Sequence, residues 1–294
     1  MAKISIPVLK AWDRVFDLLQ SVNTYPYDRE GFENSILSLY PGKSTKSVFR
    51  GMAIPTLRSL GLILGYNDVI RISANGALIF GAYQISQEEG FRALRSTQFE
   101  LDTSIGIINY VEELGSVPFD KFLEYWIDLV EITQGKSFLK QELRDRAARE
   151  RIVDWVNFLI YSGLLYNSNQ YLYIYTEKLM STRNDTNPYQ QDKGETFRDL
   201  FFRCYKRIVV EQGGINTVEI ELLRKELALR AYQQKRLLIT EKQFDELLER
   251  LPKTTNEYTI TFGRSMGADE KLFHFKNQFF QTIFIRFYNC LVTR

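Results

Sequence analysis

Two stretches of the chain repeat one pattern of apolar and polar positions. Residues 59–73 read SLGLILGYNDVIRIS, and residues 162–175 read SGLLYNSNQYLYIY. Both consist of an apolar run, a polar turn that contains asparagine, and a second run in which alternate residues are apolar. This period of two around turn residues predicts a β-hairpin in each stretch. Gly61 and Gly163 precede the hairpins at an offset of 102 residues (163 − 61), and each predicts a left-handed residue that ends a helix.

A helix is predicted directly before each hairpin. Residues 142–160 repeat their apolar positions with the period of a helix, and residues 43–61 do the same. Pro55 lies inside the second of these segments and predicts a kink or a break there. Farther upstream, residues 30–40 and 118–133 also have helical patterns. Each copy of the repeat is therefore predicted to contain two helices followed by a two-stranded hairpin.

The C-terminal third of the chain predicts a more divergent unit with the same order. Residues 196–214 and 216–232 read as helices. A third helix is predicted over residues 240–252, where Thr240 and Gln243 have the spacing of a capping box. Apolar residues then alternate in EYTITF and KLFHF, which are separated by a Gly-bounded turn and are predicted to pair as a third hairpin.

Two polar segments mark the predicted boundaries between units. The first is GSVP at 115–118, and the second is the segment 181–195, which is rich in Asn, Asp, Gly and Pro residues. A chain of 294 residues is also longer than a usual single domain. We therefore expect a mainly α fold with small β-hairpins, of the α+β class, in three domains that span residues 1–118, 119–190 and 191–294.

Composition excludes several kinds of chemistry. The chain has a single histidine, two cysteines and neither of the common glycine-rich phosphate-binding motifs, so we expect no cofactor and no metal site. No apolar stretch is long enough for a membrane span, and the N-terminus is charged too early for a secretory signal, so a cytoplasmic protein is expected. Because the net charge is only +2, a polyanion must be bound by local patches.

Cationic residues at the starts of the helices that precede the hairpins are the candidate nucleic-acid contacts. The second helix of a helix-turn-helix lies in the major groove, with its early residues at the base edges. The predicted DNA-binding residues are Lys43, Ser44, Thr45, Lys46, Arg50 and Arg71 in the first unit, Lys140, Arg144, Arg146 and Arg149 in the second, and Lys253 and Arg264 in the third. No acid lies between Glu33 and Asp68. In the second unit Asp145, Glu150 and Asp154 are interleaved with the arginines, so a solvated helix with i, i+4 ion pairs is an equal alternative.

Other reactive residues have simpler explanations. The acid-x-lysine triplet that begins at Asp269 is explained by a charged turn, so no nuclease centre is predicted. His274 alternates with two phenylalanines and is expected on the surface, whereas Cys204 is expected in a core. Five tyrosines in and beside the second hairpin are expected to be half-buried strand residues, with stacking on unpaired bases as the alternative.

The stretches LGLILGYNDVIRISANG and SGLLYNSNQYLYIY resemble the wings of the winged-helix superfamily. Ser73 and Gly76 complete the wing pattern in the first copy only. Tandem units of this kind resemble the DNA-recognition regions of type IIS restriction and nicking endonucleases, in which winged-helix subdomains read the sequence and a separate domain cleaves. The likeness covers about residues 40–180 and implies three winged-helix domains in series. The chain departs from that family because no acid-x-lysine cleavage centre follows.

We therefore expect a non-catalytic protein that reads the sequence of double-stranded DNA. In this interpretation it is a subunit of a restriction or defence system, and a protein partner supplies catalysis. One alternative is a winged-helix scaffold that binds protein partners in a larger DNA-processing complex, which the near-neutral net charge favours. Another is a replication initiator or a transcription regulator. The third unit is expected to contact either DNA phosphates, through Lys253 and Arg264, or protein.

Overall fold

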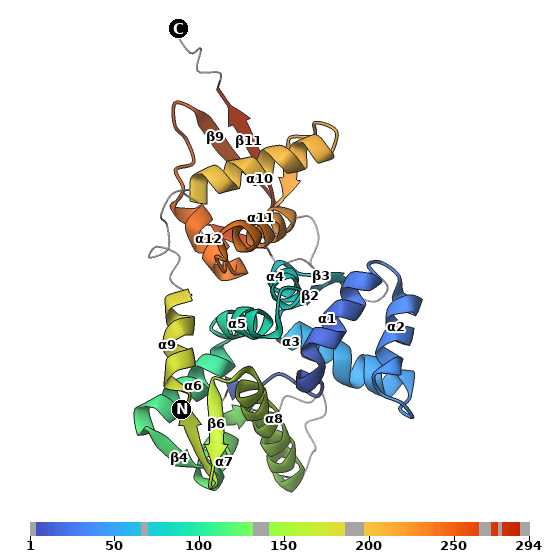
Figure 1. Ribbon diagram of the computed structural model, residues 1–294, viewed down its shortest axis with the longest axis vertical. Coiled ribbons are helices and arrows are strands. Elements are labelled where there is room, and N and C mark those ends of the chain that lie inside the picture. The colour runs from blue at the N-terminus through green and yellow to red at the C-terminus, as the bar shows by residue number, and fades with distance from the viewer. Residues whose placement is uncertain are drawn as a thin grey trace.

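The structure is a computed structural model of the chain, and it describes residues 4–65, 70–131, 141–185, 197–264, 272–275 and 278–288. The fold is mainly helical with small sheets, so the predicted α+β class is confirmed. In Figure 1 the helices form one group around α1 and α2, a second around α7 and α8, and a third around α10 to α12, with α4 and α5 between them. None of the helices in the described part of the chain has the length and apolarity that a membrane span requires.

The first unit contains the helices and the hairpin that its sequence predicts. Its elements are α1 (Val15–Thr24), α2 (Arg29–Ser38), the π-helical segment η2 (Lys46–Ala53), α3 (Ile54–Ser59), β2 (Ile63–Leu64) and β3 (Arg71–Ile72). A proline cannot donate a backbone hydrogen bond, so it is tolerated best in the first turn of a helix. Pro55 occupies the first turn of α3, and the helix changes from π to α geometry next to it. The structure thus shows a change of helix type beside Pro55, and the helical residues continue from 46 to 59 without a break.

The second unit adds a third strand to its hairpin. Its elements are α6 (Asp102–Leu114), β4 (Ser116–Pro118), α7 (Phe119–Leu129), α8 (Gln141–Ser162), β6 (Leu165–Ser168), β7 (Tyr171–Ile174) and α9 (Thr176–Asp185). The sheet has the antiparallel order β4, β7, β6. Asn169 and Gln170 form the hairpin turn with φ angles of 50° and 66°, as a two-residue turn requires. The residues predicted as a junction at 115–118 thus include a strand of this sheet.

The first two units repeat one another in their backbone hydrogen bonds. Gly61 and Gly163 both have positive φ angles, +67° and +81°, and both end a helix, as predicted. The N–H of the next residue then donates to a carbonyl five residues earlier, from Leu62 to Leu57 at 2.8 Å and from Leu164 to Leu159 at 2.9 Å. The repeat also continues past the hairpin. The bounds of α4 (Ala74–Tyr83) and α9 (Thr176–Asp185) differ by 102 residues at both ends (176 − 74 and 185 − 83).

The third unit follows the order of elements of the second, except that it adds the short strand β10 and has no counterpart of β5 (Val130–Glu131) and α9. Its elements are α10 (Phe197–Glu211), β8 (Thr217–Glu219), α11 (Ile220–Lys235), α12 (Glu241–Arg250), β9 (Tyr258–Arg264), β10 (Phe273–Phe275) and β11 (Gln278–Phe287). The last strand pairs with the first strand and with the middle one in both units, since β11 pairs with β8 and β9 as β7 pairs with β4 and β6. The capping box of Thr240 and Gln243 at the start of α12 is confirmed.

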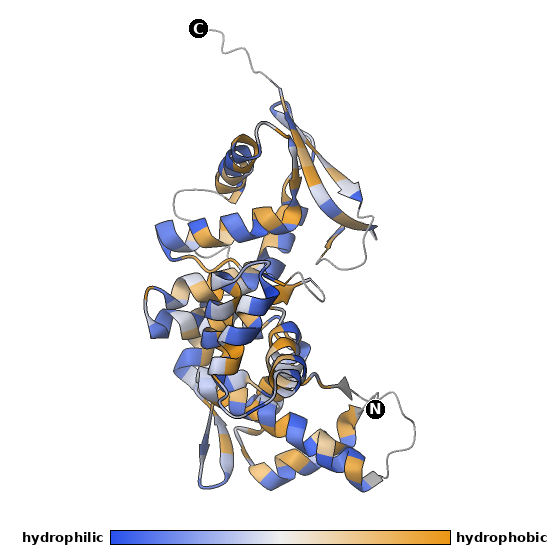
Figure 2. Ribbon diagram, turned by 90° about the vertical axis from the view of Figure 1, so that its right-hand side faces the viewer, coloured by the Kyte–Doolittle hydropathy of each residue, from blue (hydrophilic) through white to orange (hydrophobic). Residues whose placement is uncertain are grey.

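The predicted pairing of EYTITF with KLFHF is wrong. The strand β9 pairs with β11 over its whole length, from Tyr258 opposite Phe287 to Arg264 opposite Phe280, and β10 pairs with the start of β11 instead. The irregularity between Phe280 and Thr282 changes which residues of β11 face the core, so Phe280, Ile283 and Ile285 are buried. In Figure 2 apolar and polar residues alternate along the long strands of this sheet. A bulge breaks the period of two, which hides such a strand in the sequence.

Two hydrophobic cores meet at α11. The first core joins the first and second units, and the second core lies within the third unit. One face of α11 contributes Leu223, Leu227 and Ala231 to the second core, while Ala228 and Tyr232 on another face belong to the first. Because residues four apart share one side of a helix, α11 packs against both cores at once.

The N-terminal segment ties the first unit to the second. Its strand β1 (Ile4–Ser5) pairs in parallel with β5 (Val130–Glu131). The next residues run along α8, where Trp155 donates a hydrogen bond to the Pro7 carbonyl at 2.9 Å and Arg151 donates to the Ile6 carbonyl at 2.9 Å. A short 3₁₀ turn, η1 (Trp12–Arg14), then leads into α1.

A buried polar cluster joins the third unit to α4. The N–H of Asn75 donates to the Glu241 carboxylate at 2.9 Å, and the N–H of Glu241 donates to the Asn75 side-chain oxygen at 2.9 Å. The N–H of Ala74 donates to the Glu221 carboxylate at 2.8 Å. Carboxylates satisfy the free N–H groups at a helix start and interact favourably with its dipole. The start of α4 is therefore capped by side chains of α11 and α12, about 150 residues away.

Candidate nucleic-acid interface

The predicted contacts at the start of η2 are exposed. Residues 41–47 are all exposed, and so is Arg50. The Ser44 hydroxyl accepts a hydrogen bond from the Ser47 N–H at 3.3 Å, which caps the first turn. The buried residues of η2, Val48 and Phe49 among them, face the first core, so Lys46 and Arg50, four positions apart, project outward.

We name Lys43, Lys46 and Arg50 the cationic turn. Lys43 lies over the Tyr40 ring at 5.6 Å and reaches the Met52 sulfur at 3.7 Å, so it covers apolar surface and keeps its charge outside. Among the residues that the structure describes, Lys43, Lys46 and Arg50 form no ion pair. Their charge is therefore available to an external anion.

A shallow hollow lies next to the cationic turn. It has a volume of about 340 Å³ and is lined by Arg29, Glu33, Thr45, Lys46, Phe49 and Arg50. Arg29 is held in place by Glu33, whose carboxylate it meets at 2.8 Å. The lining thus contains three cations and one carboxylate, so its net charge is positive. Thr45 adds a hydroxyl, which can donate a hydrogen bond to a phosphate oxygen.

The predicted contacts on α8 are exposed but partly neutralised. Arg146 faces Glu150 at 3.4 Å, and Arg149 faces Asp120 at 3.8 Å, with arginine side chains that are 78% and 57% exposed. A hydrogen bond from Lys10 is the main reason that the pKa of Glu150 lies below its ordinary value. The pair of Arg146 and Glu150 matches the alternative of a solvated helix with i, i+4 ion pairs, whereas Arg149 faces a residue of α7. Exposed pairs are weak, however, and a phosphate can displace the carboxylate.

Of the other two predicted contacts in this unit, the structure describes one. Arg144 is exposed near the start of α8. Lys140 lies outside the described residues. Figure 1 draws α8 as a long helix whose first turns project beyond the rest of the second unit. The N-terminal part of α8 is therefore accessible to a large partner.

The remaining three predicted contacts are engaged within the protein. Arg71 faces Glu219 at 3.7 Å, so it lies between the first and third units. The Lys253 ammonium donates to the Glu249 carbonyl at 3.1 Å and to two further carbonyls at the end of α12, where cations are favoured. Arg264 is exposed at the end of β9 and donates to the Gln278 side chain at 3.1 Å.

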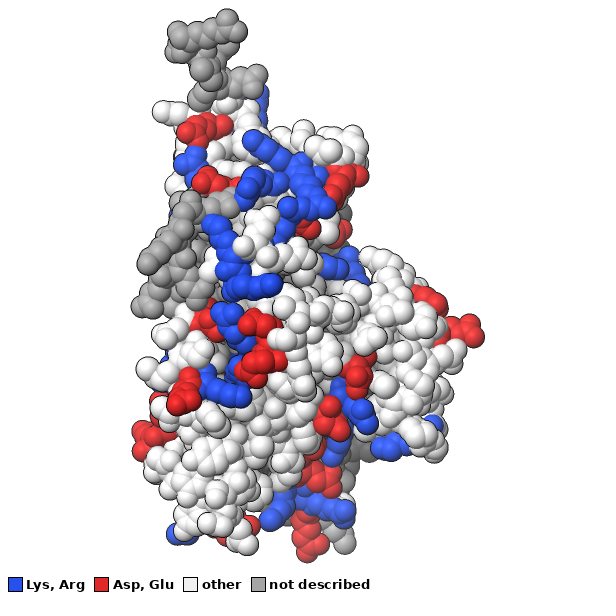
Figure 3. Space-filling view, in the orientation of Figure 1, with Lys and Arg blue, Asp and Glu red and all other residues white. Residues whose placement is uncertain are grey.

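Sequence reasoning missed a basic surface on α10. Arg203, Lys206 and Arg207 are exposed on this helix, and Figure 3 shows Lys and Arg side chains gathered over it. Arg207 is paired with Glu211 and Glu226, whereas Lys206 lies over the Phe287 ring at 4.6 Å. The spacing of three and four residues places all three side chains on one helix face, which is the signal that would have found them.

The other reactive residues behave largely as expected. Cys204 is buried, and His274 is exposed beside the Phe279 ring at 5.0 Å. Tyr166 and Tyr173 stack on each other at 5.1 Å across the second hairpin. The acid-x-lysine triplet lies outside the described residues. Within the described part of the chain, no three His, Cys, Asp or Glu residues are grouped so that they can hold a metal ion.

The candidate contacts described above are thus the cationic turn, the hollow beside it, the exposed end of α8 and the basic face of α10, which lie on three different units. Comparison with known proteins gives no relative: no family model, no curated protein and no solved structure matches the chain.

Proposed function

We propose that this chain is a non-catalytic protein that binds double-stranded DNA and reads its sequence. The observation that carries the proposal is the cationic turn, in which Lys43, Lys46 and Arg50 form no ion pair with the described residues and lie at the start of a helix that precedes a hairpin. Phosphate neutralisation by such residues supplies most of the non-specific affinity of DNA-binding proteins. Arginine can also form two hydrogen bonds to a guanine edge.

The order of elements supports three winged-helix domains in series. Apart from the short strands β5 and β10, the second and third units share the order helix, strand, helix, helix, strand, strand, with the first strand paired to the last. The first unit has the helices and the hairpin, and its hydrogen bonds at Gly61 repeat those at Gly163. In a winged helix, the helix before the hairpin enters the major groove and the hairpin touches the flanking backbone. The proposal assigns these roles to η2 and α8 and to their hairpins.

The proposed biological setting follows from the resemblance to restriction-enzyme recognition regions. A subunit that reads DNA without cutting it needs a separate protein partner for catalysis, and we place the pair in a cytoplasmic restriction or defence system. Replication initiation and transcription regulation use the same binding chemistry. Selection of binding sites from a random duplex pool distinguishes these functions from a restriction or defence system. An initiator or a regulator selects sites that recur in its own control regions.

Charge reversal on the cationic turn tests the proposal. Fluorescence anisotropy with a labelled random duplex at low salt measures the dissociation constant of the wild type and of Lys46→Glu/Arg50→Glu. Each lost phosphate contact costs about 8-fold in affinity at 0.1 M salt, so the double variant should bind at least about 60-fold more weakly. Lys235→Glu, a charge reversal at an exposed position at the end of α11, serves as the control and should stay close to the wild type.

One observation favours the scaffold as a second candidate. Arg146 and Arg149 face carboxylates of their own chain, and the exposed face of α12 carries Glu246 and Glu249. A scaffold would retain its protein partner after the charge reversal and would not bind duplex DNA at low salt. The anisotropy experiment therefore separates the two candidates without knowledge of the partner.

A further inference from the structure

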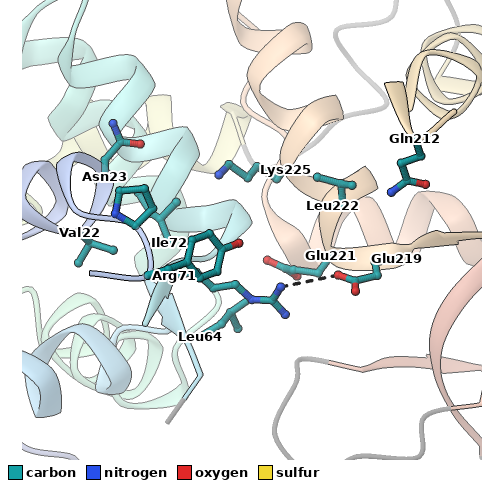
Figure 4. A pocket seen from close by; sticks show the side chains of 12 residues that line it. Val22, Asn23, Leu64, Arg71, Ile72, Gln212, Glu219, Glu221, Leu222 and Lys225 are labelled. Carbon is teal, nitrogen blue, oxygen red and sulfur yellow. Dashed lines mark ion pairs between the residues drawn. The ribbon is translucent and has the colours of Figure 1, made fainter. Parts of the chain in front are cut away.

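A cleft lies between the first unit and the third, and none of the proposed DNA-reading helices lines it. The cleft has a volume of about 440 Å³. Its lining comes from the end of α1 and the loop after it, from the first hairpin, and from the end of α10, β8 and α11 (Figure 4). Small-molecule sites have volumes of about 300–1,000 Å³ and are mostly apolar with a few polar groups. The size of the cleft falls within this range.

The apolar part of the lining comes from both sides of the cleft. These residues are Val22, Pro26, Leu64, Ile72 and Leu222. The side chain of Leu222 is 38% exposed, so it is an apolar group that the fold leaves in contact with solvent. An apolar ligand body in the cleft would remove the exposed surface of Leu222 and Pro26 from water, whereas Val22, Leu64 and Ile72 are already buried.

The charged groups in the cleft leave one cation without a partner. The Glu221 carboxylate already accepts from the Ala74 N–H and from Arg224, and Glu219 faces Arg71 at 3.7 Å. Lys225 is half-buried and, among the described residues, forms no hydrogen bond and no ion pair. A half-buried ammonium without a partner is costly, because it has lost water and gained no acceptor.

The positive charges of Lys225 and Arg71 also repel one another. Burial lowers the pKa of Lys225, the charge of Glu221 opposes this effect, and the positive charge of Arg71 lowers the pKa further. Figure 4 shows the Lys225 side chain extending from α11 towards the side formed by α1, while Arg71 extends from the hairpin towards Glu219. An anion beside Lys225 would provide the acceptor that its ammonium lacks among the described residues.

A second polar group lines the same cleft without a partner. The side-chain oxygen of Gln212 is buried and accepts no hydrogen bond from the described residues. An acceptor of this kind needs a donor, such as a hydroxyl or an amide N–H of a ligand. Asn23, on the opposite wall, can both donate and accept. The cleft is lined by two cations and two carboxylates, of which Arg71 and Glu219 pair with each other and Glu221 has partners within the protein. It therefore offers a ligand the Lys225 ammonium and two amides beside apolar side chains.

We propose that this cleft is a binding site for a small organic anion, a phosphate monoester or a carboxylate that carries an apolar body and a hydrogen-bond donor. Lys225 binds the anionic group, the apolar lining covers the body, and Gln212 accepts from the donor. Because the walls belong to the first and third units, the ligand joins the two hydrophobic cores and fixes their relative position. The site is thus an effector site, and it does not depend on the proposed DNA binding.

Titration calorimetry with phenyl phosphate tests the site, at an ionic strength held constant with sodium chloride. The wild type should bind saturably, and Lys225→Gln should bind about tenfold or more weakly, since hydrogen bonds to charged groups carry this much affinity. Lys235→Gln removes the same charge from an exposed position on the same helix and should bind like the wild type. The circular dichroism of each variant is compared with that of the wild type to verify folding.

A second variant tests the cavity rather than the charge. Leu222→Trp keeps both cations and fills the cleft, so it should abolish binding of phenyl phosphate. The proposal is overturned if the wild type shows no saturable binding up to about 10 mM, the weak end of ligand affinity, or if Lys225→Gln and Leu222→Trp bind as the wild type does. Displacement of phenyl phosphate by duplex DNA would also overturn it, because the cleft would then hold a phosphate of the DNA backbone.

Discussion

Arg224 is the residue whose removal should weaken the third unit most selectively. Its side chain is 2% exposed and meets the Asp245 carboxylate at 2.7 and 2.8 Å and the Glu221 carboxylate at 3.2 Å. The substitution Arg224→Met keeps the length of the apolar stem and removes the charge. Glu221 and Asp245 then lose their cation inside the protein. Glu221 also caps α4, so the change reaches the junction between the third unit and the rest of the chain.

The magnitude follows from the burial of the three groups. Removing one partner of a buried ion pair costs about 3–5 kcal/mol, because the remaining charge is left without compensation. The side chain of Asp245 is 31% exposed, so water can solvate its freed carboxylate in part. The lower end, a loss of about 3 kcal/mol in the free energy of unfolding, is therefore expected.

Urea denaturation with two probes measures the loss and locates it. Trp12, Trp126 and Trp155 all belong to the first core or pack against it, so tryptophan fluorescence reports on that core, whereas circular dichroism at 222 nm reports on every helix. The urea dependence of unfolding is about 1–3 kcal/mol per M, so a loss of 3 kcal/mol lowers the dichroism midpoint by about 1 M or more. The fluorescence midpoint should fall less, because the fluorescent residues lie outside the third unit.

Lys242→Met is the matched control for this experiment. It removes a cation next to the same cluster, but the Lys242 side chain is exposed, so its loss should stay within about 0.5 kcal/mol. A loss below 1 kcal/mol for Arg224→Met would refute the inference that the cluster stabilises the third unit. Equal shifts of both midpoints would refute the assignment of the loss to that unit.

Three further changes have outcomes that the structure determines. In Gly76→Ala the added methyl group would lie 2.3 Å from the Leu62 carbonyl oxygen. The free energy of unfolding, measured by tryptophan fluorescence in urea, should therefore fall by about 1–3 kcal/mol. Thr240→Ala removes the capping box that Thr240 forms with Gln243. The free energy of unfolding, measured by circular dichroism in urea, should therefore fall by about 1 kcal/mol. Burial raises the pKa of Glu100 above its ordinary value of 4.5, so its contribution to stability is present below that pH and is lost as the pH rises through the raised pKa. The glutamine in Glu100→Gln cannot ionise, so this variant does not lose stability in the same way. The difference between the urea midpoint of the variant and that of the wild type should therefore rise between pH 4.5 and 8. A difference that stays constant with pH would contradict the raised pKa.

Local patterns in the sequence predict the elements that local physics determines. The period of two and the glycines at 61 and 163 predict both hairpins, because a left-handed residue is needed where each preceding helix ends. The proline at 55 predicts the change of helix type, since it lacks a backbone N–H. The charge pattern on 142–160 predicts both the exposure of the α8 arginines and their competing ion pairs.

Contacts between distant segments account for what the sequence does not reveal. Nothing in the pattern of 116–118 indicates that these residues pair with 171–173, because a strand of three residues has no visible period. The long strand β11 escapes notice because an irregularity interrupts its alternation. The positions of Arg71 and Lys253 depend on how the third unit packs and on where α12 ends, so their engagement within the protein follows only from the fold.

The salt dependence of duplex binding tests the central claim most directly. Anisotropy of a labelled random duplex, measured between about 50 and 200 mM salt, gives the slope of the logarithm of the binding constant against the logarithm of the salt concentration. If Lys43, Lys46 and Arg50 each neutralise a phosphate, the slope should be about −2.7 or steeper, and Lys46→Glu/Arg50→Glu should reduce it by about 1.8. No binding at 50 mM salt with about 100 μM protein, or an affinity that does not change with salt, would contradict the account.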